Sequence, residues 1–335
     1  MEKVTLDALP EFLIGQAQDT EAMTGCTAII APMGAVCGVD IRGGSPGTRD
    51  TAALDPLCNR NEVHAVLLSG GSSFGLDGAG GLMSLLEEKQ IGRDVGVTVV
   101  PNVCTAILFD LACGSSFVRP DGAMGRRAGE NAFLHLPFQS GSFGAGAGAT
   151  IGKTNGLQNA MKGGIGAAAF RYGELIATAV FAVNCVGDIV ENGRIIAGAR
   201  SSHGPGFADS EKMILESYAN EKDFFSGNTV LGCIMTNALL TKAQASRLAG
   251  RGQDAIAKTV HPAHSIFDGD TVFTLASGKV IASMDAVGIL AEHAASEAIT
   301  TAVKSAESYE YYLSYKDYQF LEHHQNREES YHEDH

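Results

Sequence analysis

The segment Ser226-Gly-Asn-Thr229-Val-Leu-Gly-Cys-Ile-Met-Thr-Asn237 places a hydroxyl residue at the start of an apolar run. Residues 230–235 have the composition of a buried strand, and a polar stretch, residues 193–222, precedes them. Threonine is a poor nucleophile unless a base lies within hydrogen-bond reach. A cut between Asn228 and Thr229 would free an α-amine, a base whose reference pKa is about 7.7–8.0. Taken alone, Thr229 also fits an ordinary strand threonine.

The composition narrows the class of protein. The 335 residues include 41 glycines, 19% charged residues and a net charge of −14. The low charged fraction excludes global disorder, and the acidic balance argues against nucleic acid and anionic membranes as partners. We expect no membrane span, because no apolar run approaches ~20 residues. The seven cysteines form no C-x-x-C pair, and the N-terminus lacks a signal-peptide pattern. We therefore expect reduced thiols in the cytoplasm.

The chain alternates apolar runs with helical patterns, as an α/β protein does. Two apolar runs near the N-terminus cover residues 26–32 and 34–41. Strands are predicted for residues 63–68, 97–101, 107–111, 163–169, 176–183, 230–235, 271–276 and 280–284. Helices are predicted from within residues 70–81 to Glu88, at 242–257 and at 285–306, with helical character also at 212–218.

The C-terminal segment, residues 309–335, differs from everything before it. It holds six of the eight tyrosines, four of the ten histidines, and seven acidic residues against two basic ones. The segment therefore carries −5 of the net charge of −14. We expect a solvated or partner-contacting appendage there.

The glycine cluster at residues 70–81 follows a predicted strand and opens a helix, the setting of a phosphate cradle. Its spacing is that of neither the dinucleotide-binding motif nor the P-loop, and no lysine lies near it. Close packing of a helix on a sheet explains the glycines as well. A glycine-loop nucleotide enzyme therefore stays open as one alternative.

The segment Asp268-Gly-Asp270-Thr271 fits a metal or phosphoryl-transfer site and fits a plain turn into a strand equally well. The D-x-D-x-T pattern would need its threonine one residue later. His203, His261 and His264 lack the helical spacing of a zinc site, so we interpret them as loop histidines and expect no metal.

The order of several motifs resembles that of the L-aminopeptidase/D-esterase family, which includes β-aminopeptidases and the nylon-oligomer hydrolase. The resemblance extends from about residue 10 to residue 305, without the C-terminal segment. Beside the segment around Thr229 and the D-G-D-T turn, its landmarks are Thr24-Gly-Cys-Thr27, Arg42-Gly-Gly-Ser-Pro-Gly-Thr-Arg49, Gly70-Gly-Ser-Ser-Phe-Gly-Leu-Asp77, Gly146-Ala-Gly-Ala-Thr-Ile-Gly-Lys153 and Asn184-Cys-Val-Gly-Asp188.

The resemblance implies a four-layer αββα sandwich, like that of the N-terminal-nucleophile hydrolases but with its own connectivity. It also implies a precursor that cuts itself between Asn228 and Thr229. Residues 1–228 and 229–308 would then be two chains of one domain, followed by the segment 309–335.

The same resemblance implies roles for individual residues. Thr229 would be the nucleophile, with Asp268 and Asp270 beside it, Asn184 holding the oxyanion and Lys153 near the catalytic amine. The substrate pocket would include Gly71, Ser72 and Phe74. Some members carry tyrosine where this chain has Phe74, so a phenol donor is missing here. Asp77 and Asp188 are candidates for binding a substrate amine.

Together these observations predict an aminopeptidase or amidohydrolase that releases N-terminal residues from short peptides, amides or esters. No metal or organic cofactor is expected, since nucleophile, base and oxyanion donors all come from protein. The resemblance further implies a homo-oligomer, a tetramer of two-chain protomers. An unprocessed small-molecule-binding or scaffold protein of the same fold is the alternative.

Overall fold

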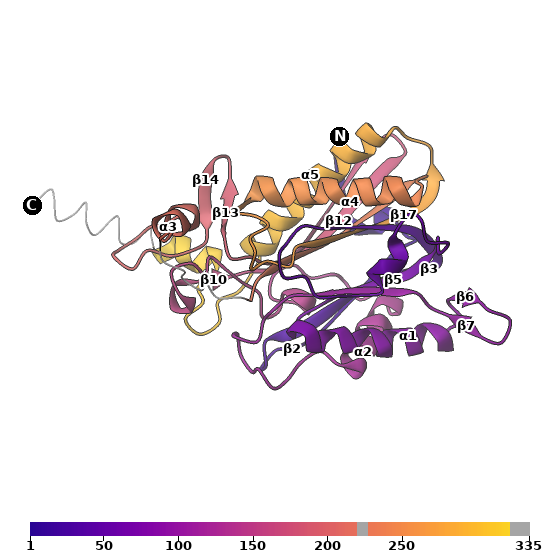
Figure 1. The fold of residues 1–335 in the computed structure, drawn as a ribbon, viewed down its shortest axis with the longest axis horizontal. Coiled ribbons are helices and arrows are strands. Elements are labelled where there is room, and N and C mark those ends of the chain that lie inside the picture. Colours follow the sequence, from indigo (N-terminus) through magenta and orange to yellow (C-terminus); the bar gives the residue numbers. More distant parts are fainter. Residues whose placement is uncertain (220–226, 322–335) are drawn as a thin grey trace, which may run out of the picture.

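Two sheets lie face to face between two pairs of helices in the computed structural model, which describes residues 1–219 and 227–321. Figure 1 shows α4 (Lys242–Thr259) and α5 (Met284–Lys304) on one side of the strands, with α1 (Gly78–Glu88) and α2 (Gly122–Phe133) on the other. The expected αββα sandwich is confirmed.

The first sheet carries the strand that begins at Thr229. Its order is β1 (Glu2–Val4), β11 (Gly164–Tyr172), β12 (Leu175–Asn184), β15 (Thr229–Ala238), β17 (Thr271–Val280) and the C-terminal half of β3 (Thr24–Ile41). Neighbours are antiparallel except β15 and β17, which run parallel. Parallel strands start at the same edge of a sheet, so the turn before β17 lies near the start of β15.

The second sheet is built around the N-terminal half of β3. The strands of this sheet are β2 (Leu13–Asp19), β3, β5 (Val63–Ser69), β8 (Val103–Ile107) and β4 (Thr48–Arg49). The long β3 thus joins both sheets, and its register with β5 shifts between Ile30 and Ala35. Gly34 lies at this bend with φ +73, a backbone conformation that glycine adopts readily.

Three apolar layers hold the sandwich together. One lies between the sheets, where Leu231, Cys233 and Met235 of β15 meet side chains of β3, β5 and β8. A second packs the other face of β15 and its neighbours against α4 and α5, and the third packs β3 and β5 against α1 and α2. Because β15 is buried on both faces, it reads as a continuous apolar run.

The glycine cluster at residues 70–81 serves helix packing where it enters α1. A Cβ at Gly81 would overlap the backbone of Gly122, and one at Gly125 would overlap Gly78. The backbones of α1 and α2 therefore touch at these glycines, which favours the packing interpretation over the phosphate cradle.

The smaller elements connect the layers. They comprise β6 (Arg93–Asp94), β7 (Val99–Val100), β9 (Thr150–Ile151), β10 (Met161–Lys162), β13 (Asp188–Glu191), β14 (Arg194–Ala197), α3 (Ser210–Glu216), β16 (Val260–His261) and 3₁₀ turns at Leu6–Ala8, Thr51–Leu54, Ser72–Asp77, Gly144–Gly146 and Leu157–Asn159. Within the described ranges, no helix has the length and apolarity that crossing a membrane would need.

Two predicted strands are wrong. The chain leaves β8 at Ile107, so residues 107–111 are not a strand, because the Asp110 carboxylate accepts hydrogen bonds from Thr24 Oγ1 and Gly71 N instead. Residues 280–284 are not a separate strand either. β17 continues to Val280, and the Ser283 hydroxyl then caps α5 by accepting from Ala286 N.

Other predictions failed in part. The strand predicted at 97–101 is reduced to β7, a two-residue pair with β6. Helix α2 was not predicted, because its glycine-rich sequence has weak helix propensity.

The C-terminal segment was expected to be a solvated or partner-contacting appendage, and for Tyr312 and Tyr318 the expectation of a solvated side chain is wrong. Tyr312 is 1% exposed, and its hydroxyl donates to Ala112 O. Tyr318 is also buried, and its hydroxyl bonds to the backbone of Gly206. The rest of the predicted segment, with its four histidines, lies outside the described residues, as do residues 220–226.

Candidate active site

Thr229 is the first residue of β15, in the middle of the first sheet, and is 2% exposed. It lies opposite Asn184, the last residue of β12. Its hydroxyl oxygen, Oγ1, accepts a hydrogen bond of 3.0 Å from Gly269 N. A backbone amide therefore points at the oxygen that would carry negative charge if this hydroxyl lost its proton.

The turn that supplies this amide also carries both predicted carboxylates. Asp270 Oδ1 accepts from Val230 N at 2.7 Å, so it is bound to the residue that follows Thr229. Asp268 accepts from the amide and hydroxyl of Ser265 and from Val186 N. Both carboxylates are 1% exposed. The parallel pairing of β15 and β17 explains why this turn meets Thr229.

Lys153 reaches the same place from the chain that follows β9. Its Nζ donates to Asn184 O at 2.9 Å and to Asn184 Oδ1 at 3.1 Å. It also donates to Gly227 O at 3.3 Å and to Asn228 Oδ1 at 3.0 Å. The buried ammonium group thus binds both residues that precede Thr229.

Asn184 is held from several sides. Its Oδ1 also accepts from Thr150 N, and its Nδ2 donates to Phe109 O at 2.9 Å and lies 3.4 Å from Gly227 O. The amide N–H group therefore faces the backbone just upstream of the Asn228–Thr229 bond. In that position it can donate to an oxygen on this segment.

Burial shifts the proton affinities of the charged groups. Burial raises the pKa of the Asp268 carboxyl, and the charge of Asp270 raises it further, with Lys153 acting in the opposite direction. Burial lowers the pKa of Lys153, which the nearby negative groups only partly offset. Both shifts make proton transfer at these two groups easier near neutral pH, as in many catalytic sites.

The loop of residues 42–49 packs against the turn that carries Asp268 and Asp270 and bonds to its backbone. Ser45 N donates to Asp268 O, and Arg42 N donates to Asp270 O. A Cβ at Gly43 would overlap the Asp268 backbone, so this approach requires glycine. The loop that the sequence marks only as turn chemistry is therefore a scaffold for the carboxylates.

His264 belongs to the site, although the sequence indicated only a loop histidine. Its ring Nδ1 lies 2.7 Å from Asp270 Oδ2, and its backbone N donates to the same oxygen at 3.1 Å. Burial lowers the pKa of His264, but the hydrogen bond and charge of Asp270 outweigh this, and the net shift is upward. Its position six residues before an aspartate gave no recognisable signal.

The three predicted pocket residues lie on a neighbouring loop. Gly71 N donates to Asp110 Oδ1, and Ser72 N donates to Leu108 O. Phe74 is 53% exposed, with the Arg119 guanidinium 3.8 Å from its ring centre. No described hydrogen bond or ring contact joins these residues to Thr229. Their link to the site is indirect, through the segment whose Phe109 carbonyl holds Asn184.

Neither candidate for binding a substrate amine lies free in the site. Asp188 is buried, and it accepts from Ala199 N and from the amide and hydroxyl of Ser210. Burial raises its pKa to about 6. Asp77 is exposed at the end of a 3₁₀ turn. Over the described part of the chain, no group of three or more His, Cys, Asp and Glu side chains is placed to hold a metal ion.

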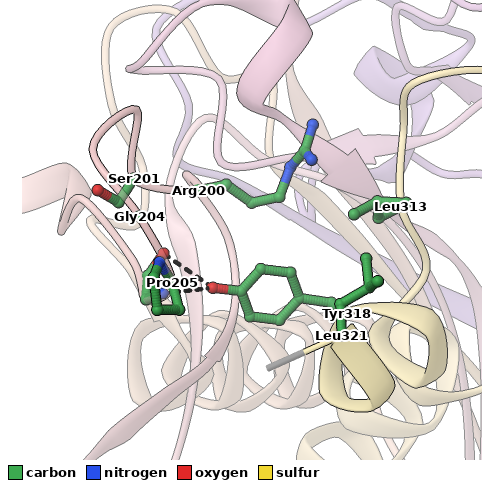
Figure 2. Close-up of a pocket in the computed structure, with 8 residues that line it drawn as sticks. Arg200, Ser201, Gly204, Pro205, Leu313, Tyr318 and Leu321 are labelled. Carbon is green, nitrogen blue, oxygen red and sulfur yellow. Dashed lines mark hydrogen bonds between the residues drawn. The ribbon is translucent and has the colours of Figure 1, made fainter. Parts of the chain in front are cut away.

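Thr229 does not open onto the surface pocket drawn in Figure 2. That pocket, of about 230 Å³, lies between the loop around Pro205 and the C-terminal segment. Figure 2 shows the Tyr318 hydroxyl bonded to this loop, with Arg200 on the other side of the pocket. Because Thr229 is itself only 2% exposed, the nucleophile candidate is enclosed in the uncut chain.

Comparisons with known proteins agree with this fold. Peptidase family S58 matches residues 9–313. An uncharacterized aminopeptidase of Mycobacterium leprae is 36% identical over 318 residues, covering 85% of this chain and 83% of the relative. A 6-aminohexanoate-oligomer endohydrolase of Paenarthrobacter ureafaciens is 30% identical over 277 residues, covering 81% and 74%.

Solved structures show the same fold at lower identity. The L-aminopeptidase D-Ala-esterase/amidase of Ochrobactrum anthropi, described as a variant of the Ntn hydrolase fold, superimposes with a TM-score of 0.66 at 16% identity, covering 93% of this chain and 90% of that one. A β-aminopeptidase from Burkholderia gives a TM-score of 0.62 at 18% identity, covering 90% and 86%. The expected family is thus confirmed: the chain is a hydrolase that belongs to peptidase family S58.

Proposed function

We propose that the protein is a self-processing aminopeptidase or amidohydrolase whose nucleophile is Thr229. The observation that carries the proposal is the position of Thr229 Oγ1. It lies directly after Asn228, accepts from Gly269 N, and adjoins the turn that bears Asp268 and Asp270. A buried hydroxyl beside two carboxylates and an ammonium group is the kind of cluster that catalytic sites use.

Self-cleavage is the first reaction we propose. Thr229 Oγ1 attacks the carbonyl carbon of Asn228, and the carbon–nitrogen bond to Thr229 breaks. The acyl group moves to the hydroxyl oxygen as an ester, and the proton of the hydroxyl passes to the freed α-amine. Water then hydrolyses the ester and separates residues 1–228 from residues 229–335.

The polar groups around Thr229 are placed to stabilise the charge that develops during self-cleavage. The Gly269 amide stabilises developing charge on the hydroxyl oxygen. The Asn184 side-chain amide and the Lys153 ammonium both donate to Gly227 O, one residue before the carbonyl on which the oxyanion would form. Removing one such donor typically lowers the rate of related enzymes by ~10²–10³.

After the cut, the α-amine of Thr229 takes the role of general base. It removes the proton of its own hydroxyl, whose oxygen attacks a substrate amide or ester, and it returns the proton to the leaving group. Asp270 and Asp268 place carboxylates beside the amine and orient it. All groups come from this chain.

The substrate's acyl part would occupy the volume that Asn228 fills before the cut. Once Asn228 leaves, Lys153 loses two of its acceptors, Gly227 O and Asn228 Oδ1, and can bind carbonyl oxygens of a substrate. We infer that short peptides, amides or esters are the substrates. The relatives' names, aminopeptidase and 6-aminohexanoate-oligomer endohydrolase, support the same class.

Mass spectrometry of the purified protein tests the proposal. We expect two chains ending and beginning at Asn228 and Thr229, together with hydrolysis of at least one substrate from a panel of aminoacyl amides. The Thr229→Ala variant should stay a single chain of 34.9 kDa. A wild-type protein that stays uncut and hydrolyses nothing would refute the proposal, and so would a Thr229→Ala variant that is cut at the same bond.

A further inference from the structure

We propose that His264 is a positioning residue that orients the Asp270 carboxylate toward the start of β15. This inference rests on the proposed function, because it concerns how the nucleophile's surroundings are held. The sequence motifs did not assign His264 a role in the site.

The two oxygens of Asp270 have separate partners. Oδ1 accepts from Val230 N at 2.7 Å, one residue after the nucleophile. Oδ2 accepts from His264 twice, from Nδ1 at 2.7 Å and from the backbone N at 3.1 Å. A carboxylate only accepts hydrogen bonds when ionised, so the Nδ1 atom must carry a proton. His264 thus fixes the rotation of the carboxylate, so that its other oxygen accepts from Val230 N.

No other described side chain shares this task. The Lys153 ammonium bonds to Asn184, Gly227 and Asn228, and its described hydrogen bonds do not include Asp270. The second ring nitrogen of His264, Nε2, is buried, and the backbone of Gln253 also favours the protonated ring. Among the described side chains, the ring is hydrogen-bonded to Asp270.

The backbone of His264 supports a specific role. Its φ of +57 lies in the left-handed region, which is uncommon for residues other than glycine, although asparagine, aspartate and histidine adopt it more often than the rest. Such a conformation persists where the surroundings fix it, and it is frequent at functional sites. Here it brings the backbone N and the ring Nδ1 to one carboxylate oxygen.

Charge supports the same arrangement. The hydrogen bond to Asp270 and its negative charge favour the protonated ring, which strengthens the contact. The charge of Arg42 acts in the opposite direction and lowers the pKa of the ring, and the Arg42 guanidinium is itself paired with Asp40. The His264 ring and the buried Asp270 carboxylate thus form a close pair beside the position where the amine of Thr229 forms.

Two substitutions separate the ring from the backbone. His264→Gly removes the ring donor, keeps the backbone N–H group and relieves the left-handed backbone. His264→Asn keeps the backbone tolerance and places a side-chain N–H group near the same oxygen. We would measure processing by mass spectrometry, kcat and KM on the best amide of the panel, and the melting temperature.

We expect His264→Gly to slow processing and lower kcat by roughly 10- to 100-fold, the effect of one charge-assisted hydrogen bond. KM should change little, and the melting temperature should stay near that of the wild type. His264→Asn should recover most of the lost kcat.

Wild-type kcat and processing in His264→Gly would overturn the inference. Equal losses in both variants together with a lowered melting temperature would also overturn it, because the ring would then serve only the fold. The wild-type protein is the control for the underlying proposal. If it is uncut and inactive, the proposed function itself has failed, whereas an active wild type with an unaffected His264→Gly variant removes only the role of His264.

Discussion

Gly269→Ala tests whether the proposed reaction depends on the close contact between Gly269 N and Thr229 Oγ1. A Cβ at this position would lie 2.8 Å from Thr229 Oγ1 and 2.7 Å from Ser45 O. Gly269 does not have a positive φ, so alanine meets no backbone strain there. The substitution therefore acts through space alone, on the hydroxyl oxygen and on the supporting loop.

The size of the effect follows from these distances. Ordinary contact begins at 3.4 Å, so the hydroxyl oxygen must move by about 0.6 Å or the turn must retreat by as much. A misplacement of 1 Å can lower an enzymatic rate by about 10²-fold. We expect Gly269→Ala to slow processing and hydrolysis by about 10- to 100-fold. Overpacking should also destabilise the fold by about 1–3 kcal/mol.

Gly80→Ala is the matched control, because a Cβ there has no heavy atom within 4 Å. Gly80 lies inside α1, where alanine should stabilise the helix by about 0.5–1 kcal/mol. The assay follows the appearance of the two chains over time by mass spectrometry, with initial hydrolysis rates and melting temperatures. If Gly269→Ala is processed and hydrolyses at wild-type rates, the close approach of this amide to Thr229 is not part of the reaction.

Three further predictions concern the site and its frame. Lys153→Met should leave the chain uncut, since the buried ammonium is lost while its volume is kept; mass spectrometry would detect any cleavage. The Asp188 pKa of about 6 exceeds its unfolded value of about 3.9. Between these pH values the folded state therefore binds more protons than the unfolded state. As pH falls from about 6 to 4, the free energy of unfolding should rise by up to about 3 kcal/mol in the chain with Asp188, relative to Asp188→Asn. Urea unfolding of both chains, each carrying Thr229→Ala, measures this difference. In the same background, Tyr312→Ala should lower the free energy of unfolding by roughly 3–5 kcal/mol, whereas Tyr218→Ala, at a side chain that is 90% exposed, should change it by under about 0.5 kcal/mol.

Thr229, Asn184 and Lys153 could be predicted because each belongs to a short sequence pattern that is visible without the fold. An apolar run that begins at Thr229 marks a buried strand, and the ordered motifs around Asn184 and Lys153 carry the family resemblance. The structure brings these residues together with Asp268 and Asp270. The pocket residues around Phe74 were predicted from the same resemblance, and their contact with substrate stays a prediction.

Strand ends were harder to predict, because tertiary contacts decide them. The apolar character of residues 107–111 favours a strand, yet the Asp110 carboxylate is needed by Thr24 and Gly71 on neighbouring elements. Likewise, Tyr312 is in a polar, tyrosine-rich segment that looks solvated, but its ring fits against the body of the protein.

The sequence by itself determined the class of fold, the family and the position of the nucleophile candidate, because apolar periodicity and motif order are written along the chain. The tertiary structure alone decided which groups meet there. The parallel pairing of β15 with β17 places the Asp268–Asp270 turn at Thr229, and the left-handed backbone of His264 brings its ring to Asp270. Hydrogen bonds between residues far apart in the chain depend on distances of a few ångströms, which residue spacing does not encode.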